Sequence, residues 1–536
     1  MVAEIEILVE RRRERRSGQN IRRWFTLAVL CLGSMTAFVN VSSTITGLAR
    51  IQDELHASPT ETVWITSTYS LIVASLILAA GTLADIVGRS VIFMVGAVLF
   101  TGGSVVAFAA NDTALLIVGQ AIIGIGGAAI LPSSLAVLAH TFADPRERTE
   151  AVSIWAGSSG LGLAVGPIVT GVLLEHYSWH SIFVTNMVLG VIAFLGAVLF
   201  VPASRQPDRK LDPVGLMLGT IAVASLAFAI IEGKTLGYFS TAILCAYTTF
   251  AVSLVIFAWY ESRHHDPMID IKLFRSGSFT MVMAVAATTM FGFTGTSLLV
   301  VLYCQHVQGV TPLGAGVRAL AMFVPFILIS ALAGKIAHRI GFKVILTVGL
   351  IVMAAGIFAL RAIEAGPDSS RLWPGLIIVG IGTGLLVAPS TAAAVISVHR
   401  SQAGMASAMV NMFRQLGNVL GASVTGTILT TKFSDGLGER LTEHHLPQQT
   451  IDSVVDAAQR GNHDSARLPT ELASLVADSA RRAFTDASHL SALVTATIIA
   501  AIVIPTVLFI RHRPAEPTNI DTAKTSHPGT GKSFAP

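Results

Sequence analysis

Charged side chains are scarce in this sequence. They make up 13% of its 536 residues, whereas soluble domains carry about 25%. Hydrophobic residues make up 52%, and the mean hydropathy is +0.68. A chain this long and this apolar cannot cover its surface with polar groups, so we expect it to lie in a lipid bilayer. The composition excludes a soluble enzyme, a nucleic-acid-binding protein and a secreted disulfide-rich scaffold.

Cysteine is also scarce, and no residue pattern suggests catalysis. The three cysteines, Cys31, Cys245 and Cys304, all fall within apolar stretches, so they indicate neither a disulfide framework nor a metal site. The histidines lie largely in loops and form no clear metal-binding pattern. With no nucleophile, metal or cofactor constellation, we predict that the protein is not an enzyme and has no cofactor.

Long apolar runs dominate what is present. A helix needs about 20 apolar residues to cross the hydrocarbon core of a bilayer. The runs are too long and continuous for the alternating strands of a membrane barrel. The sequence therefore predicts an all-α polytopic membrane protein with fourteen transmembrane helices, at 24–47, 62–82, 91–110, 114–138, 150–174, 181–201, 213–231, 240–259, 280–303, 316–337, 343–361, 373–396, 404–429 and 489–510.

The distribution of Lys and Arg predicts the orientation. Cytoplasmic loops are enriched in these residues, and most of the 36 in this chain fall on the cytoplasmic side if the N-terminus is cytoplasmic. An even number of spans then places both termini in the cytoplasm. The Arg-rich start at 1–23 could also open a signal peptide, but the apolar run of about 24 residues that follows is too long for one.

An internal repeat suggests how the spans are grouped. Gly81-Thr-Leu-Ala-Asp-Ile-Val-Gly88 follows the second span, and Gly334-Lys-Ile-Ala-His-Arg-Ile-Gly341 follows the tenth. Two six-span halves would place each motif after the second span of its half, an architecture typical of transporters. The predicted organisation is a basic N-terminus (1–23), an N-terminal six-helix bundle (24–201), a two-helix insert with loops (202–279), a C-terminal six-helix bundle (280–510) with an outer loop (430–488), and a cytoplasmic tail (511–536).

Several motifs carry a resemblance to a known family. They are Trp64-Ile-Thr-Ser-Thr-Tyr69, Gly81-x-Leu-Ala-Asp85-x-x-Gly88-Arg89, Gly162-x-x-x-Gly166-Pro167, Ser178-Trp179-His-Ser-Ile-Phe183-x-x-Asn186, Gln305-x-x-Gln308-Gly309, and the span 13 pattern from Gly404 through Asn411 and Arg414 to Gly417. In this order they resemble the major facilitator superfamily, specifically the fourteen-span drug:proton antiporter branch of multidrug efflux proteins. The resemblance covers about residues 24–510.

The resemblance implies a cell-membrane transporter that exports hydrophobic small molecules or drugs by alternating access, with protons as the counter-ion. It also implies that a loop motif and a glycine-rich helix seam control gating. In the loop motif, the Asp85 carboxylate is expected to accept bonds from a neighbouring helix or from an Arg, and Arg89 is either its partner or a membrane anchor. The predicted gating residues are Gly81, Asp85, Gly88, Arg89, Gly162, Gly166 and Pro167.

Two departures from the family pattern concern proton coupling. The branch usually has an Asp in span 1 and an Arg in span 4, and these positions hold Asn40 and Gln120. A proton-driven exporter needs a group that changes protonation during transport, which leaves Asp85, Glu232 or the substrate itself. We therefore expect weak coupling or a displaced proton site. The alternatives are a facilitator or lipid or metabolite exporter, and a sensor or scaffold that uses the outer loop.

The predicted substrate cavity follows from the spans that line it in this family. Aromatic and methionine side chains suit an adaptable apolar pocket, although each could equally face lipid or a packing partner. Arg414 lies in span 13, where it would bond backbone carbonyls or contact a polar or anionic substrate group. The predicted cavity residues are Phe38, Asn40, Gln120, Trp155, Phe291, Tyr303, Asn411 and Arg414, with Met290, Phe293, Met322 and Phe323 as further members.

The outer loop 430–488 is the one sizeable soluble segment. It contains two weakly amphipathic stretches, near 448–459 and 469–486. We expect a surface cap, with a partner protein as the alternative.

Overall fold

The computed structural model contains helices and no strands in the part of the chain that it describes. The described residues are 2–142, 144–203, 212–263, 269–366, 370–398, 402–459 and 470–510. The predicted tail 511–536 lies outside them.

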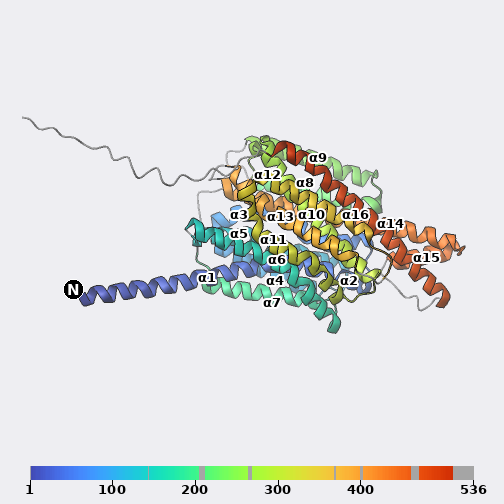
Figure 1. The fold of residues 1–536 in the computed structure, drawn as a ribbon, viewed down its shortest axis with the longest axis horizontal. Coiled ribbons are helices and arrows are strands. Elements are labelled where there is room, and N and C mark those ends of the chain that lie inside the picture. Colours follow the sequence, from blue (N-terminus) through green and yellow to red (C-terminus); the bar gives the residue numbers. More distant parts are fainter. Residues whose placement is uncertain are drawn as a thin grey trace, which may run out of the picture.

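The helices follow one another with short connections (Figure 1). The first half of the chain forms α1 (Val2–Thr46), α2 (Leu48–Leu55), α3 (Pro59–Val87), α4 (Arg89–Phe108), α5 (Thr113–Thr141), α6 (Pro145–His176) and α7 (Ser181–Phe200). The insert forms α8 (Pro213–Leu236) and α9 (Thr241–Arg263). The second half forms η1 (Ile271–Arg275), α10 (Gly277–His306), α11 (Pro312–Ile340), α12 (Phe342–Ala359), η2 (Leu360–Ala362), α13 (Leu372–Ile396), α14 (Ala403–Glu443), α15 (Gln448–Gln459) and α16 (Thr470–Phe509).

Thirteen helices among the described residues are long and apolar enough to cross a membrane, and each coincides with a predicted span. The remaining predicted span, 404–429, falls on α14. Its composition is less apolar because it carries Asn411, Arg414, Gln415 and Asn418. Gln415 and Asn418 are buried between helices, so α14 lies inside the bundle despite its polar side chains.

Large apolar side chains cover the outside of the bundle. Leu199 is 65% exposed, Val255 68% and Leu508 71%. Soluble monomers rarely expose extended apolar patches, whereas a surface that faces lipid tails must be apolar. The exposed side chains therefore mark the face that contacts the bilayer.

The two halves repeat the same helix packing. In the first half α1 packs on α6 and α7, α5 on α3 and α4, and α4 on α7. In the second half α10 packs on α14 and α16, α13 on α11 and α12, and α12 on α16. Both repeat motifs end in a glycine that joins two helices, with φ 130° at Gly88 and 87° at Gly341. Only glycine adopts such angles without strain, which explains why the repeat keeps this residue.

Two symmetric helix pairs join the halves: α3 packs against α14, and α6 packs against α11. Figure 1 shows α15 and the adjoining parts of α14 and α16 projecting from the bundle on the side opposite the start of α1. We call the side that carries the Gly88 turn the Gly88 end, and the opposite side the α15 end.

The insert covers the seam between α3 and α14. Its helix α8 contacts both of them, and an apolar cluster of Val63, Leu71, Ala227, Ile231 and Val419 fills the junction. At the α15 end, the Trp64 indole nitrogen donates a 2.8 Å hydrogen bond to Glu232 Oε1. Glu232 thus joins α8 to α3.

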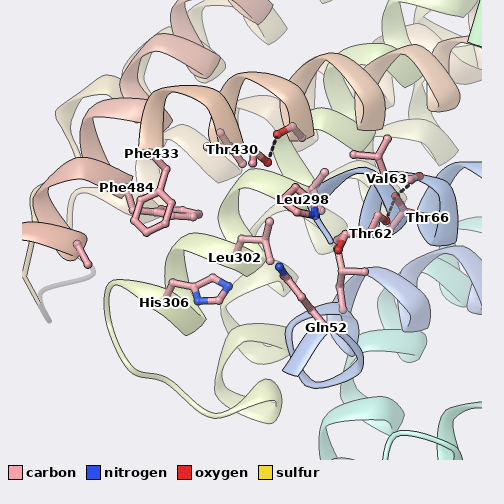
Figure 2. Close-up of a pocket in the computed structure, with 15 residues that line it drawn as sticks. Gln52, Thr62, Val63, Thr66, Leu298, Leu302, His306, Thr430, Phe433 and Phe484 are labelled. Atoms are coloured by element: carbon pink, nitrogen blue, oxygen red, sulfur yellow. Dashed lines mark hydrogen bonds between the residues drawn. The ribbon is translucent and has the colours of Figure 1, made fainter. Parts of the chain in front are cut away.

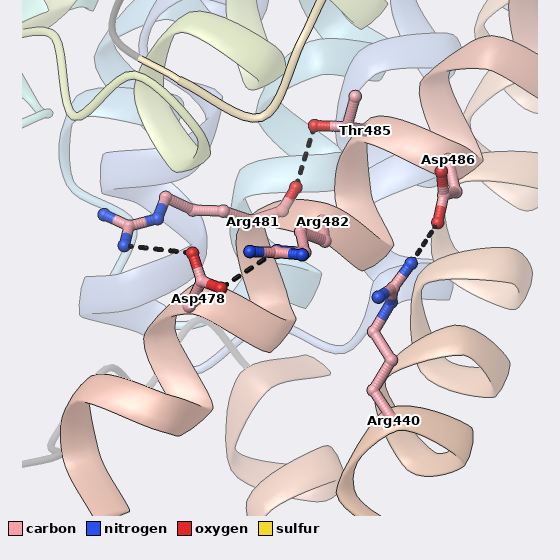
Figure 3. Close-up of polar contacts among 6 residues, drawn as sticks. All are labelled: Arg440, Asp478, Arg481, Arg482, Thr485 and Asp486. Atoms are coloured by element: carbon pink, nitrogen blue, oxygen red, sulfur yellow. Dashed lines mark hydrogen bonds and ion pairs between the residues drawn. The ribbon is translucent and has the colours of Figure 1, made fainter. Parts of the chain in front are cut away.

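The predicted outer loop 430–488 is largely helical. α14 continues to Glu443, α15 follows, and α16 begins at Thr470. The two amphipathic stretches bury their apolar sides in a cluster of their own, which includes Leu437, Leu441 and Ile451. One ion pair joins α14 to α16 beside this cluster, with Arg440 Nη2 lying 2.7 Å from Asp486 Oδ2 (Figure 3). The segment is therefore a folded extension of two bundle helices, because each helix carries enough apolar surface to bury outside the membrane.

Candidate functional site

A small cavity lies between the two halves at the centre of the bundle. We call it the central cavity. About 350 Å³ of space among its lining residues is free of protein atoms, part of it open to solvent, and the side chains leave only a narrow gap. Helices α1, α6, α10, α11 and α14 all contribute to its wall. The lining residues are Phe38, Val41, Ser42, Ile45, Leu163, Met290, Phe293, Thr294, Ser297, Phe323 and Asn418.

One side of the central cavity is polar. Thr294 Oγ1 donates to Asn418 Oδ1 at 2.6 Å, and Asn418 Nδ2 donates to Gln415 Oε1 at 2.8 Å. Ser297 and Ser42 add hydroxyl groups to the lining. None of the lining residues has an ionisable side chain. The cavity therefore suits an uncharged, largely apolar molecule that carries a hydrogen-bonding group.

Asn40 and Gln120 are not among the residues that line this cavity. They belong to a network of amides that we call the amide network. Asn40 Nδ2 donates to Gln120 Oε1 at 3.2 Å, and Asn186 Nδ2 donates to Asn40 Oδ1 at 2.8 Å. Gln120 Nε2 donates to Thr44 Oγ1 at 3.0 Å. The network joins α1, α5 and α7 within the first half.

The amide network is closed to solvent. Asn40 and Gln120 are each 1% exposed and Asn186 is fully buried. A charge in the hydrocarbon region costs several kcal/mol, whereas hydrogen-bonded amides are satisfied without any counter-ion. The exchange of an acid and a base for two amides thus keeps the helices joined while removing charge from this position.

Arg414 is likewise not among the residues that line the central cavity. Its Nη2 group donates to Ser390 Oγ at 3.0 Å and to Thr391 Oγ1 at 2.8 Å, both on α13. The same group bonds the carbonyl of Val387. Pro389 lies within α13 beside these acceptors. Of the two predicted roles, the structure thus places Arg414 against backbone and hydroxyl oxygens.

Substitution of Arg414 by Met is expected to weaken the contact between α14 and α13. Hydrogen bonds to a charged group contribute about 1.5–3 kcal/mol, so export is expected to fall about tenfold. If Arg414 has a structural role, the Met variant exports neutral and anionic compounds more slowly to the same extent. Efflux of both kinds of compound is measured in the same cells. Arg414→Lys, which keeps the charge, is the matched variant, and a selective loss of anionic export in Arg414→Met would contradict the structural role.

The loop motif forms a compact turn at the Gly88 end. Arg89 bonds the Asp85 carboxylate through Nε at 3.0 Å and Nη2 at 2.9 Å. Its Nη1 reaches the carbonyl of Ala136 on α5 at 3.3 Å. Both charged side chains are largely buried, with 13% of the Arg89 and 15% of the Asp85 side chain exposed. Arg89 is therefore positioned as the partner of Asp85, and the pair ties the turn between α3 and α4 to α5.

The predicted glycine seam lies between α1 and α6. A Cβ atom on Gly162 would lie 2.5 Å from the Met35 carbonyl oxygen, and one on Gly166 would collide with the Ser42 hydroxyl. The next residue, Pro167, faces the other half, because a Cβ atom on Gly316 of α11 would lie 2.7 Å from its carbonyl oxygen. Helix α6 thus packs closely on its own half and across the interface.

The second half contains a matching seam that the sequence analysis missed. Cβ atoms on Gly417 and Gly421 of α14 would collide with the backbone carbonyls of Ala287 and Phe291 on α10. α14 and α10 occupy the places of α6 and α1 in the repeat. The Gly417-x-x-x-Gly421 spacing, which equals that of Gly162 and Gly166, was the signal that could have identified it.

The other predicted cavity residues are distributed between the cavity and the packed core. Phe38, Met290, Phe293 and Phe323 line the central cavity. The rest, Trp155, Phe291, Tyr303, Met322 and Asn411, are absent from its lining. Trp155 donates to Ser134 at 3.1 Å, Asn411 donates to the Ser407 carbonyl of its own helix, and Tyr303 bonds the Glu364 carbonyl. Sequence analysis also missed Asn418 and Thr294, which form the polar side.

Within the described part of the chain, no three His, Cys, Asp or Glu side chains are grouped closely enough to bind a metal ion.

The sequence matches proteins with known roles. The family model described as Major Facilitator Superfamily matches residues 30–422. "Multidrug resistance protein Stp" of Mycobacterium tuberculosis is 31% identical over 436 residues, covering 81% of this chain and 80% of the relative. "Multidrug efflux pump LfrA" of Mycolicibacterium smegmatis is 30% identical over 491 residues, covering 90% of this chain and 95% of the relative.

Solved structures share the fold at low sequence identity. A bacterial homolog of the human lysosomal transporter Spinster, in an inward-facing and unoccupied conformation, superposes with a TM-score of 0.63 at 16% identity, covering 92% of this chain and 99% of that chain. A POT family transporter in complex with 5-aminolevulinic acid gives a TM-score of 0.61 at 15% identity, covering 90% and 96%. These matches establish the all-helical two-bundle fold.

Proposed function

The chain belongs to the major facilitator superfamily of multi-pass membrane transporters, and we propose that it exports hydrophobic small molecules by alternating access. The observation that carries this proposal is the central cavity, which is apolar, bears one polar side and is built by both halves. A site between two repeats opens to opposite sides of the membrane when the halves rock. The relatives described as multidrug resistance and efflux proteins support drug-like substrates.

The proposed direction of transport depends on the orientation of the chain. We place both termini on the cytoplasmic side of the cell membrane, because most Lys and Arg residues then lie in cytoplasmic segments. The Gly88 end is then cytoplasmic and the α15 end faces outward. A compound taken up at the Gly88 end would leave at the α15 end.

The amide network favours export without the standard proton site. The neutral side chains of Asn40 and Gln120 hold the positions where the resemblance implies an acid and a base. The lining of the central cavity offers no ionisable side chain in their place. This combination favours the second candidate function, a facilitator or lipid or metabolite exporter that moves its substrate with little or no proton exchange.

Proton movement in vesicles tests the coupling. The purified protein is reconstituted in liposomes that contain a pH-sensitive dye, and a neutral hydrophobic compound is added on one side. We expect substrate flux without a matching proton flux, because neither the amide network nor the lining of the central cavity exchanges protons. Protein-free liposomes serve as the control for passive entry of the compound.

A proton flux that rises in proportion to substrate flux would contradict transport without proton exchange. It would also point to Asp85 or Glu232, which the chain retains, as the proton carrier. Absence of any protein-dependent substrate flux, tested with neutral, anionic and cationic compounds, would contradict the transport proposal itself.

A further inference from the structure

A second and larger cavity lies at the α15 end of the bundle. We call it the end pocket. It holds about 800 Å³ of free space, part of which opens to solvent. Figure 2 shows Leu298, Leu302 and His306 of α10 on one wall, with Phe433 of α14 and Phe484 of α16 beside them and Val63 of α3 opposite. Both halves of the protein therefore build it.

The end pocket shares two helices with the central cavity. α10 and α14 line both cavities, and their end-pocket residues all lie closer to the α15 end than their central-cavity residues. Ser297 lines the central cavity and Leu298 the end pocket, and since neighbouring residues of a helix point about 100° apart, the end pocket borders an adjoining face of α10. A molecule that leaves the centre toward the α15 end passes along helices that also line the end pocket.

The lining is apolar with a few polar groups. The rings of Phe433 and Phe484 meet edge to face with centroids 5.7 Å apart, a favourable arrangement for aromatic side chains. The His306 ring lies 5.5 Å from that of Phe484. Gln52 and Thr62 add hydrogen-bonding groups from the first half. Apart from His306, this lining resembles that of the central cavity in chemistry, so it suits the same uncharged hydrophobic compounds.

The folded extension holds the outer wall of the end pocket in place. Phe433 packs against the apolar cluster that α14, α15 and α16 form outside the bundle. Arg440 and Asp486 connect α14 and α16 one to two turns beyond Phe433 and close to Phe484. The aromatic wall therefore belongs to a packed segment in which an ion pair joins α14 to α16.

We propose that the end pocket is a second binding site, which a neutral hydrophobic compound occupies after it leaves the central cavity. This inference rests on the proposed export function. The occupant is the transported compound, because the pocket lies between the two halves and shares α10 and α14 with the central cavity. A lipid chain that only covered the bundle would require neither feature.

Photolabelling tests the site directly. The full-length protein in lipid nanodiscs is irradiated with a neutral trifluoromethyl-phenyl diazirine, and labelled peptides are identified by mass spectrometry. We expect label on residues 298–306, 426–433 and 480–484 in addition to the central cavity. An excess of an exported compound is expected to remove both sets of labels.

A bulky substitution provides the matched comparison. Thr430 lines the end pocket and bonds the Gly426 carbonyl of its own helix at 2.8 Å. Thr248 on the lipid-exposed face of α9 makes the same bond to Leu244 at 2.8 Å. Thr430→Trp is expected to reduce end-pocket labelling about fivefold, or about 1 kcal/mol of binding, and to slow efflux while the central label persists. Thr248→Trp is expected to leave labelling and efflux unchanged.

Three results would overturn the inference. One is the absence of label in the end pocket of the unsubstituted protein. Another is label that only a diazirine phospholipid deposits and that the exported compound cannot displace, which would identify a lipid site. The third is normal efflux in Thr430→Trp despite lost labelling, which would place the pocket off the path. Loss of export in the unsubstituted protein would instead contradict the proposed function, since labelling in nanodiscs does not depend on transport.

Discussion

Replacement of Asn40 by Asp is expected to destabilise the protein severely, and addition of Gln120→Arg is expected to restore much of the loss. Asn40 is 1% exposed and its two amide atoms bond Gln120 and Asn186. An Asp at this position loses the donor to Gln120 and brings a charge into the core of a helix bundle. Leaving a buried charge without its partner costs about 3–5 kcal/mol.

The double substitution places a cation opposite the new carboxylate. Asn186 Oδ1 is buried without a hydrogen-bond partner, so it offers an acceptor to an Arg at position 120. Thermal unfolding of the purified protein in detergent, measured for both single variants and the double variant, gives the coupling between the positions. We expect the summed losses in free energy of unfolding of the two single variants to exceed the loss of the double variant by about 2 kcal/mol.

If the stability losses of the two single variants simply add up in the double variant, positions 40 and 120 do not interact and the amide network does not act as one unit. An unchanged melting temperature in Asn40→Asp would show that position 40 is open to water, as a place in the cavity wall would require. The same variants in the vesicle assay address function: a proton flux that appears only in the double variant would show that these two positions are where coupling was lost.

Replacement of Gly162 by Ala is expected to reduce export by about tenfold or more, whereas Gly157→Ala on the same helix is expected to have no effect. The added Cβ at Gly162 would lie 2.5 Å from the backbone carbonyl oxygen of Met35, which cannot rotate away. At Gly157 there is nothing within 4 Å. Overpacking a tight contact costs about 1–3 kcal/mol, whereas Ala in an open helix position is favourable.

The second half offers the same comparison. Gly421→Ala would collide with the Phe291 carbonyl, and Gly438→Ala on the same helix meets nothing within 4 Å. Efflux rates, normalised to the amount of folded protein in the membrane, separate the four variants. Equal activity of Gly162→Ala and Gly157→Ala would show that α1 and α6 tolerate a wider spacing and that the seam does not limit transport.

Hydropathy predicted the spans well because lipid-facing helices must be apolar along their whole length. α14 shows the limit of this signal: its span, 404–429, is less apolar than the others, because Gln415 and Asn418 are buried among other helices, where a polar side chain meets partners instead of lipid. The repeat glycines Gly88 and Gly341 were detectable because their backbone angles leave no alternative residue.

The cavity was harder to predict because a sequence does not show which way a helix face points. Asn40 and Phe38 are two residues apart on α1, yet Phe38 lines the central cavity and Asn40 faces α5 and α7. Asn418 was not predicted as a cavity residue, whereas the charged Arg414 on the same helix was, although Asn418 forms the polar side of the cavity. The outer loop was predicted as a surface cap with amphipathic stretches at 448–459 and 469–486, which coincide with α15 and the start of α16. Their packing against α14 was not predicted, because the apolar stretches are short and pair only across the three helices.

The length of α14 has a mechanical consequence. Its 41 residues span about 60 Å at 1.5 Å per residue, and the helix runs without a break from the interface between the halves to the tip of the extension. A tilt of about 15° would move a point 40 Å from the pivot by about 10 Å. Two spectroscopic labels, one on α15 and one on α2, would therefore convert a small rotation in the membrane into a large and measurable change of distance.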